Sequence, residues 1–321
     1  MRATRVPSLR GLGVGLGLGL GLVGLAGCVD DVDIGVRTDP VIGGTVTAEG
    51  QFPGVGALLY DLGGGDAQAG CTGTLISPTV VLTAAHCVDP QLGGDALVGF
   101  TLVHDTLAAP PAMTAVTRKV AHAQFDFNAE LGPGLGQWFD IGLVFLAAPI
   151  TEVAPIRLPR PADGADLIAN ADLTIVGYGR TSNDTQDVGV MHDAPTKLVS
   201  LNDWELQVGM GQGQPQNCHG DSGGPALAEL AGTRVVGVVS RSFDLSSECL
   251  NGGVDTRVDA YLDWIVAQGV TDLPCGSGLA AACAGDEDDG GGCCSTSSRS
   301  PLGPLVLAAL ALAPLARRRR R

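Results

Sequence analysis

The apolar positions of this chain fall into short β-branched runs separated by glycine-rich segments. Residues 80–83, 139–146 and 233–240 are three such runs. Short apolar runs bounded by glycine or proline are typical of buried strands. Residues 259–268 instead have apolar side chains at helical spacing, which predicts a helix. The pattern therefore favours an all-β domain that closes with a C-terminal helix.

The N-terminal segment follows a different pattern. Residues 1–27 begin with three arginines and continue into an apolar run, residues 11–25, which is short and glycine-rich for a membrane span. This arrangement is typical of a secretory signal peptide. The end of the run, followed by Cys28, resembles the cleavage box of a bacterial lipoprotein, in which the cysteine carries the lipid. Ordinary signal cleavage near Ala26 is the alternative.

The C-terminal segment repeats this arrangement in reverse. An acidic, glycine-rich linker, residues 271–292, precedes a tail, residues 293–321, with two cysteines, an apolar stretch and five arginines. The apolar stretch is shorter than the ~20 residues of a membrane span, but the arginines would hold it at the cytoplasmic face during export. The tail resembles the sorting tails of myxobacterial surface proteins, which implies transfer to the cell surface. A plain tail anchor is the alternative.

Length and charge narrow the class of protein. The chain of 321 residues leaves room for one domain, residues 41–270, after a short propeptide or linker, residues 28–40. The 48 glycines against three Trp, three Tyr and seven Phe favour many tight turns. All 34 acidic residues but only 11 of the 19 basic ones lie between Cys28 and Ala316. The resulting formal charge of 11 minus 34, or −23, argues against a nucleic-acid partner.

Cysteine content agrees with export. An exported chain meets an oxidising compartment in which disulfides persist. Cys28 and one or both of the paired Cys293 and Cys294 belong to the ends, which leaves six cysteines in the body: Cys71, Cys87, Cys218, Cys249, Cys275 and Cys283. Spacing alone does not fix their pairing. No Cys/His group has the paired short spacing of a zinc site, so we expect neither a metal ion nor a cofactor.

Three segments contain the residue types that nucleophilic catalysis requires. His86 follows a predicted strand and is expected in a loop, Asp140 opens a strand apolar enough to be buried, and Ser222 lies among glycines in residues 220–225. Those glycines permit a tight turn that exposes the hydroxyl and directs neighbouring N–H groups to one point. A serine nucleophile needs a base within hydrogen-bond reach, and the base needs an acceptor that fixes its tautomer. One candidate for each role is present.

The order His, Asp, Ser, with the motifs TAAHC and GDSGGP, resembles the trypsin/chymotrypsin family over residues 41–270. The resemblance implies two six-stranded antiparallel β-barrels with a C-terminal α-helix and a site in the cleft between them. It implies a serine endopeptidase that forms an acyl-enzyme, with His86 as general base and then acid, Asp140 as its orienter and Ser222 as nucleophile. The N–H groups of Gly220 and Ser222 would form the oxyanion hole. The serine comes last, which differs from the order in α/β-hydrolases.

The resemblance also implies two disulfides and one further hydrogen-bond partner. It pairs Cys71 with Cys87 beside the histidine, and Cys218 with Cys249 at the substrate pocket. Ser240 matches a position that contacts both the triad aspartate and the substrate backbone.

The expected substrate pocket departs from trypsin itself. Gln216 stands six residues before the serine, where trypsin-like members have an acidic floor, and Asn217 follows it. Ser242 and Gly253 match the pocket walls. A neutral floor argues against plain trypsin specificity, because a buried cation needs a compensating charge. Asp255 matches a position that is usually aromatic and lies behind the floor; it either supplies this charge or is a surface aspartate.

Activation in this family frees an apolar N-terminus whose amine pairs with the aspartate before the nucleophile. Val41 resembles that terminus and Asp221 its buried partner, with a simple turn aspartate as the alternative. Pro40 precedes the cleavage position instead of a basic residue, so self-activation by trypsin-like cleavage is not expected, and cleavage at Arg37 would leave three extra residues. Cleavage before Val41 would also separate the domain from a lipid on Cys28.

These observations together predict an exported serine endopeptidase, a monomer held at the cell surface or outer membrane of a Gram-negative bacterium by its lipid or its tail. Its partners would be protein or peptide substrates. The alternative from another class is a catalytically idle protease fold that serves as a surface binding module, and a serine esterase is a narrower one. Idle relatives usually lose a triad residue, whereas this chain retains all three candidates.

Overall fold

The structure, a computed structural model, describes residues 40–278 except 109, 130–131, 181–187, 211–213, 246–248 and 250. The chain divides into two units, Met1–Val36 and Arg37–Arg321, and all described residues belong to the second. The predicted signal peptide, the lipidated Cys28 and the sorting tail therefore lie outside the described residues.

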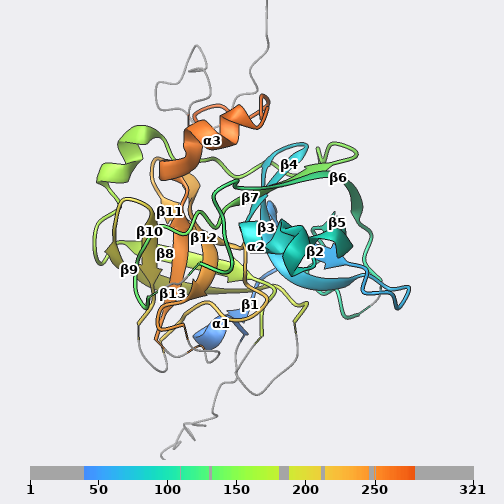
Figure 1. The fold of residues 1–321 in the computed structure, drawn as a ribbon, viewed down its shortest axis with the longest axis horizontal. Coiled ribbons are helices and arrows are strands. Elements are labelled where there is room, and N and C mark those ends of the chain that lie inside the picture. Colours follow the sequence, from blue (N-terminus) through green and yellow to red (C-terminus); the bar gives the residue numbers. More distant parts are fainter. Residues whose placement is uncertain are drawn as a thin grey trace, which may run out of the picture. The chain divides into compact units, whose positions relative to one another are not determined.

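Six strands form a first closed antiparallel barrel (Figure 1). In spatial order they are β2 (Val55–Tyr60), β3 (Gln68–Ser77), β4 (Val80–Thr83), β7 (Gly142–Leu146), β6 (Thr114–Ala121) and β5 (Leu97–Thr101), and β5 pairs back to β2. All four residues of β4 are buried, as expected for an apolar run that lies inside a sheet. β4 pairs with β7, which brings the segments after Thr83 and before Gly142 side by side.

A second closed barrel follows in the chain, and it contains β8 (Asp172–Gly177), β9 (His192–Leu201), β10 (Glu205–Val208), β13 (Gly253–Arg257), β12 (Thr233–Ser242) and β11 (Pro225–Glu229). β8 pairs with both β9 and β11 and so closes this barrel. The short β1 (Thr45–Val46) adds to β9. The predicted fold class, two six-stranded antiparallel barrels, is confirmed.

Helices are few and short in the part of the chain that the structure describes. They are α1 (Pro40–Gly43), α2 (Ala85–Val88) and α3 (Leu262–Ala267), with single 3₁₀ turns at Pro90–Leu92, Gly94–Ala96, Pro161–Ala165 and Asp259–Tyr261. The predicted C-terminal helix is the last 3₁₀ turn followed by α3, which buries Leu262 and Ile265. Within the described residues, no helix has the length and apolar character that crossing a membrane requires.

Candidate active site

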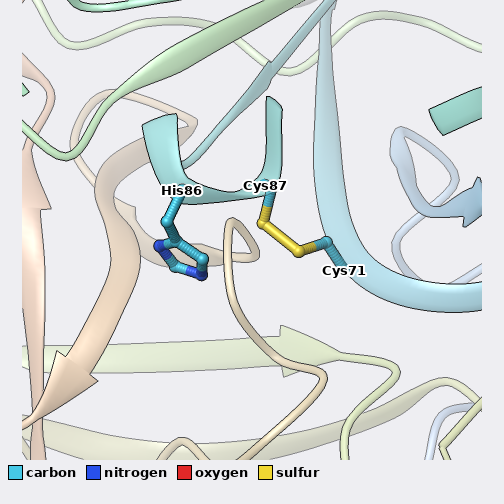
Figure 2. A group of neighbouring side chains, drawn as sticks. All are labelled: Cys71, His86 and Cys87. Atoms are coloured by element: carbon cyan, nitrogen blue, oxygen red, sulfur yellow. A yellow bond between two sulfur atoms is a disulfide. The ribbon is translucent and has the colours of Figure 1, made fainter. Parts of the chain in front are cut away.

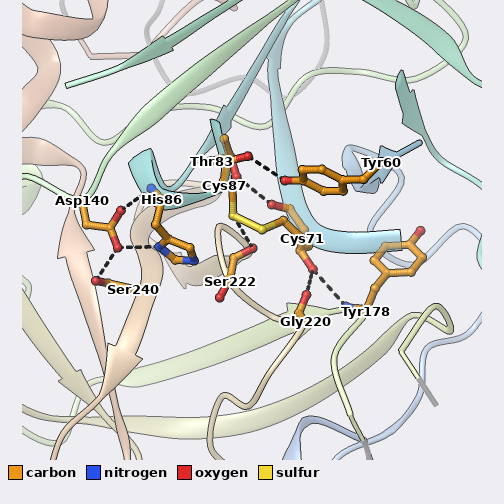
Figure 3. Close-up of a disulfide and its surroundings, with 11 residues drawn as sticks. Tyr60, Cys71, Thr83, His86, Cys87, Asp140, Tyr178, Gly220, Ser222 and Ser240 are labelled. Carbon is orange, nitrogen blue, oxygen red and sulfur yellow. Dashed lines mark hydrogen bonds and ion pairs between the residues drawn. A yellow bond between two sulfur atoms is a disulfide. The ribbon is translucent and has the colours of Figure 1, made fainter. Parts of the chain in front are cut away.

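His86 and Asp140 form a directly bonded pair at the end of the first barrel. β4 ends at Thr83, and His86 then lies in the single turn α2, where a loop had been expected. Its Nδ1 lies 2.8 Å from Oδ2 of Asp140, and its backbone N–H donates to Oδ1 at 3.0 Å (Figure 3). β4 pairs with β7, and Thr83 lies opposite Gly142. The segment after β4, which contains His86, therefore lies next to the segment before β7, which contains Asp140.

The carboxylate of Asp140 is fully buried and has a further partner from the second barrel. The hydroxyl of Ser240 donates to Oδ2 at 2.7 Å, and the hydroxyl of Thr256 donates to the Asp140 carbonyl oxygen at 2.8 Å. Burial alone would raise the pKa of Asp140, but the charge of His86 and hydrogen bonds from His86 and Ser240 hold it below its ordinary value. Asp140 therefore stays an acceptor for the imidazole.

The imidazole of His86 responds in the opposite direction. Burial lowers the pKa of His86, but the charge and hydrogen bond of Asp140 more than offset this and raise it above the ordinary 6.5. A proton on Nδ1 donated to Asp140 leaves Nε2 with its lone pair toward the cleft. Figure 3 shows the ring between Asp140 and Ser222. The arrangement is that of a base whose tautomer is fixed by a buried acceptor.

Ser222 lies in a series of tight turns that precedes β11. The N–H of Asp221 donates to the Cys218 carbonyl at 3.0 Å, and the N–H of Gly224 donates to the Asp221 carbonyl at 2.7 Å. Gly220 has a φ of 97°, and a Cβ there would lie 2.7 Å from Cα of Gly179, so glycine is required. Neither the Gly220 N–H nor the Ser222 N–H donates to any residue that the structure describes, and both remain available to a ligand.

A threonine of the first barrel holds this turn in place. The backbone N–H of Thr72 donates to the Ser222 carbonyl at 2.8 Å, and its hydroxyl donates to the Gly220 carbonyl at 2.9 Å. The Cys87 sulfur also lies 3.6 Å from the Ser222 carbonyl oxygen, a packing contact because a disulfide sulfur has no hydrogen (Figure 3). Thr72 thus fixes the Ser222 turn of the other barrel, as Ser240 and Thr256 fix Asp140.

Two pockets meet at His86 and Ser222. One has a volume of about 460 Å³. It shares His86, Phe127, His219 and Ser222 with the other pocket and is further lined by Trp138, Asn217, Cys218, Val239, Ser240, Arg241, Ser242, Leu245 and Cys249. The other, of about 490 Å³, extends past Tyr60, Leu62 and Leu92. An extended ligand that passes over Ser222 therefore finds a hollow on either side of it.

Comparison with known proteins agrees with this geometry. The family model described as trypsin matches residues 41–265. The chain belongs to the trypsin family. It is 31% identical to CLIP domain-containing serine protease B15 of Anopheles gambiae over 256 residues, 71% of this chain and 69% of that protein. It is also 31% identical to chymotrypsin-like elastase family member 1 of Canis lupus familiaris over 241 residues (70% and 90%), and 30% identical to a trypsin of Saccharopolyspora erythraea over 217 residues (63% and 88%).

Membership of the trypsin family makes the chain a serine endopeptidase, a hydrolase, with protein or peptide substrates. Its disulfides join Cys71 to Cys87 and Cys218 to Cys249, the two pairs that the resemblance implied, and Cys275 is also disulfide-bonded. Figure 2 shows His86 beside the Cys71–Cys87 disulfide. The atoms that could bind a metal ion, one from each of the three residues, lie within 4.8 Å of one another. Because both sulfurs are bonded to each other, neither is available as a thiolate for a metal ion.

Only some of the residues predicted to form the substrate pocket of this trypsin-family protein line the cavity itself. Asn217, Ser240 and Ser242 line the pocket. Gln216 is 1% exposed, and its side chain bonds to backbone of the loop around Cys249, donating to that residue's carbonyl at 2.8 Å. Asn217, and not Gln216, therefore faces the cavity. Gly253 lies behind Asn217, because a Cβ on it would be 2.9 Å from Asn217 Nδ2.

Asp255 is buried and is not a surface aspartate. It is 0% exposed, and its Oδ1 accepts a hydrogen bond from Asn217 Nδ2 at 2.8 Å. Its Oδ2 and the Oδ1 of Asn217 have no hydrogen-bond partner among the described residues. Burial raises the pKa of Asp255 to about 8, with the Asn217 bond opposing and the charge of Asp221 adding to the shift. A pKa of about 8 favours a neutral carboxyl group behind the pocket residue Asn217 at pH 7.

The activation residues are also inside the protein. Val41 is 0% exposed with a φ of 42°, which a β-branched residue rarely adopts. The Asp221 carboxylate accepts N–H bonds from Gly179 and Cys218, both at 2.8 Å, and burial raises its pKa to about 7. Since the Val41 nitrogen is in a peptide bond with Pro40 in the whole chain, it contributes no charge to balance Asp221.

Sequence reasoning missed several residues that shape the site. Thr256 bonds to the backbone of Asp140, and Phe127, Trp138 and Arg241 line the pocket. Trp138, two positions before Asp140, could have been singled out by its nearness in sequence. The others come from separate strands and loops, and nothing in their local sequence marks them.

Proposed function

We propose that this trypsin-family protein cleaves peptide bonds with Ser222 as nucleophile, His86 as base and Asp140 as the group that orients it. The observation that carries the proposal is the His86–Asp140 bond of 2.8 Å in a cleft that Ser222 shares. The Ser222 oxygen attacks the substrate carbonyl while its proton passes to His86 Nε2. That proton then goes to the leaving amine, and the C–N bond breaks to leave an acyl-enzyme. Water next attacks the acyl carbonyl while His86 takes its proton, and the proton passes to the Ser222 oxygen as the ester C–O bond breaks.

The N–H groups of Gly220 and Ser222 serve as the oxyanion hole in this mechanism. Both donors are unused by described residues, so they need no rearrangement when charge develops on the substrate oxygen. Asn217, Ser240, Ser242, Gly253 and Asp255 would determine which side chain the adjoining pocket accepts, with Gln216 shaping it from behind.

Cleavage before Val41 would complete the site in this proposal. The new ammonium group would pair with Asp221, whose buried carboxylate accepts only backbone N–H groups from the residues that the structure describes. A buried charge without its partner costs ~3–5 kcal/mol. Formation of the ion pair would remove this cost and so stabilise the conformation in which the new N-terminus lies beside Asp221. The disulfides favour an exported, oxidising location. Attachment to a bacterial cell surface by Cys28 or the C-terminal tail remains part of the proposal.

The proposal is tested by labelling the exported protein with a fluorophosphonate probe and sequencing its N-terminus, with Ser222→Ala as the control. We expect labelling of the chain that begins at Val41 and none of the Ser222→Ala protein. A chain that begins at Val41, is folded and takes up no probe would instead support an idle surface module. Labelled protein that cleaves small esters but no peptide would support an esterase.

The raised pKa of His86 predicts where activity fails on acidification. Only the neutral imidazole accepts the serine proton, so kcat/KM should fall as pH drops through the pKa of His86 in the free enzyme. Because this pKa is raised, the acid limb should have its midpoint above 6.5. Initial rates on one peptide substrate across the pH range, with the fold monitored by circular dichroism, measure it. A midpoint below 6.5 in folded protein would contradict the Asp140 effect.

A further inference from the structure

The backbone that leads into Asp140 has a conformation that its side chain disfavours. Phe139 has a φ of 57°, in the left-handed region where a bulky residue is a rare outlier. The N–H of Ile141 donates to the Phe139 carbonyl at 2.9 Å, so Asp140 is the central residue of a three-residue turn. The direction of the Asp140 side chain therefore depends on how the chain enters this turn through Phe139.

Two hydrogen bonds hold this turn after Phe139 in the chain. The hydroxyl of Thr256 donates to the Asp140 carbonyl at 2.8 Å, and the backbone N–H of His122 donates to the Ile141 carbonyl at 3.0 Å. Neither bond restrains the rotation about the N–Cα bond of Phe139. A disfavoured conformation persists only when its surroundings hold it, so the contacts of Phe139 itself decide whether the turn keeps its shape.

The ring of Phe139 belongs to a cluster of four rings, here called the aromatic clamp: Phe139, His122, Tyr261 and Trp264. The Phe139 ring stacks on the His122 imidazole, with centroids 5.0 Å apart and planes at 14°, and meets Tyr261 edge-on at 6.4 Å. His122 also contacts Tyr261 at 5.5 Å and Trp264 at 5.1 Å. Centroid separations of about 4.5–7 Å are attractive for stacked and edge-on rings. The last 3₁₀ turn and α3 thus support the residue that precedes Asp140.

The imidazole of His122 is fixed as a neutral stacking partner. The N–H of Gln124 donates to its Nδ1 at 3.2 Å, which requires a lone pair on that nitrogen and places the remaining proton on Nε2. Burial lowers the pKa of His122, which also favours the neutral ring. The backbone of Gln124 therefore orients the ring whose face lies against Phe139.

We propose that the aromatic clamp positions Asp140 for catalysis by holding Phe139 in the left-handed conformation from which the carboxylate reaches His86. This inference rests on the proposed function, because it takes Asp140 as the group that orients the base. Phe139 is a positioning residue, since it acts through the backbone of Asp140 and not on the substrate. Release of the clamp would let Phe139 relax to an ordinary φ and would weaken the Asp140–His86 bond.

Phe139→Leu and Phe139→Asn form a matched pair that tests this role. The two new side chains have nearly the same shape and neither is aromatic, but Asn adopts a positive φ more readily than Leu. With active sites titrated, we expect kcat to fall about tenfold in Phe139→Leu and less than about threefold in Phe139→Asn, with KM within about twofold in both. Packing alone predicts the reverse order, because the apolar Leu fills the cluster better. A kcat of Phe139→Asn equal to or below that of Phe139→Leu would overturn the proposal.

Two further comparisons test the backbone and the stacking partner separately. Phe139→Ala and Phe139→Gly repeat the comparison with small side chains, Gly should be the more active, and this pair decides the question if Phe139→Leu does not fold. His122→Ala keeps the backbone N–H that Ile141 accepts and removes the stacked ring. It should lower kcat about as much as Phe139→Leu does, but less than about twofold in a Phe139→Asn background. An equal fall in both backgrounds would overturn the place of His122 in the clamp.

The pKa of His86 separates this inference from the proposed function. The charge and hydrogen bond of Asp140 raise this pKa, so it reports the Asp140–His86 geometry without any catalysis. It is measured by NMR titration in a Ser222→Ala background, with the His86 signal assigned by its loss in His86→Gln. A lower pKa of His86 in Phe139→Leu than in Phe139→Asn supports the clamp even when the wild-type protein is inactive. Equal pKa values in the two variants contradict the clamp even when Ser222 is the nucleophile.

Discussion

Replacing Asp140 with Asn is expected to lower kcat about 10⁴-fold, the size of this change in proteases with such a triad, without unfolding the protein. The two carboxylate oxygens of Asp140 accept from three donors: the backbone N–H of His86, its Nδ1–H and the Ser240 hydroxyl. An amide offers one acceptor oxygen and one donor group in the same space. The NH₂ group of the new Asn side chain must therefore face at least one group that donates a hydrogen bond to Asp140 in the wild-type protein.

The backbone N–H of His86 decides which side that is. It cannot become an acceptor, so the amide oxygen takes the place of Oδ1, and the NH₂ group takes the place of Oδ2. The imidazole then accepts at Nδ1 and moves its proton to Nε2, where it can no longer take a proton from Ser222. The Ser240 hydroxyl can turn and accept, so packing is retained.

Ser240→Ala is the control for Asp140→Asn. It removes one hydrogen bond to Oδ2 but leaves both bonds to His86, so kcat should fall less than about tenfold. Active-site titration and single-turnover rates on one peptide substrate, with thermal unfolding of each variant, provide the comparison. An Asp140→Asn protein that is folded and retains kcat within about tenfold of wild type would show that Asp140 does not set the tautomer.

The candidate triad could be predicted from the sequence because each residue is tied to its own local segment. His86 follows β4 directly and Asp140 precedes β7, and these strands pair, with Thr83 opposite Gly142. The buried apolar runs that predicted strands are thus the same elements that bring two of the residues together. The position of Ser222 depends on the glycines of its turn, and these glycines can be recognised directly in the GDSGGP motif.

The contacts between barrels could not be predicted in the same way. Thr72 and Thr256 bond to site residues 148 and 116 positions away, and a threonine in a strand has no local mark of such a role. Ser240 lies 100 positions from Asp140, and only the family resemblance, not its local sequence, indicated their contact. The bonds of Glu205 are similar, because its partners Gly136 and Arg241 lie 69 and 36 residues away in the chain. Alternation along a strand predicts which face a residue is on, but not which distant loop packs against that face.

Replacing Asp255 with Asn is expected to stabilise the protein by an amount that grows as pH rises from about 4 to about 8. Burial raises the pKa of Asp255 from 3.8 to about 8. Between these values the unfolded chain has lost the proton and the folded protein retains it, so the folded state binds more protons and stability falls as pH rises. The stability that the protonated Asp255 contributes to the wild-type protein is fully present below pH 3.8 and is lost as the pH reaches about 8.

The substituted amide carries no titrating proton and fits the same contacts. Its oxygen can accept the Asn217 bond, and its NH₂ group occupies the place of Oδ2, which has no partner among the described residues. The advantage of Asp255→Asn at pH 8 over pH 4 should be on the order of 3–5 kcal/mol, since each pKa unit corresponds to about 1.4 kcal/mol. The burial of Asp221 is the same in both proteins and cancels in the difference, whereas its repulsion of an ionised Asp255 is lost in Asp255→Asn and forms part of the advantage.

Urea unfolding of both proteins at a series of pH values, in a Ser222→Ala background that prevents self-digestion, measures this difference. Asp263→Asn, which makes the same substitution at an exposed position in α3, is the matched control. Parallel curves for wild type and Asp255→Asn would mean that Asp255 is ionised inside the folded protein. A negative charge behind Asn217 would then favour a basic substrate side chain in the pocket, whereas the expected divergence indicates a pocket floor that is neutral near pH 7.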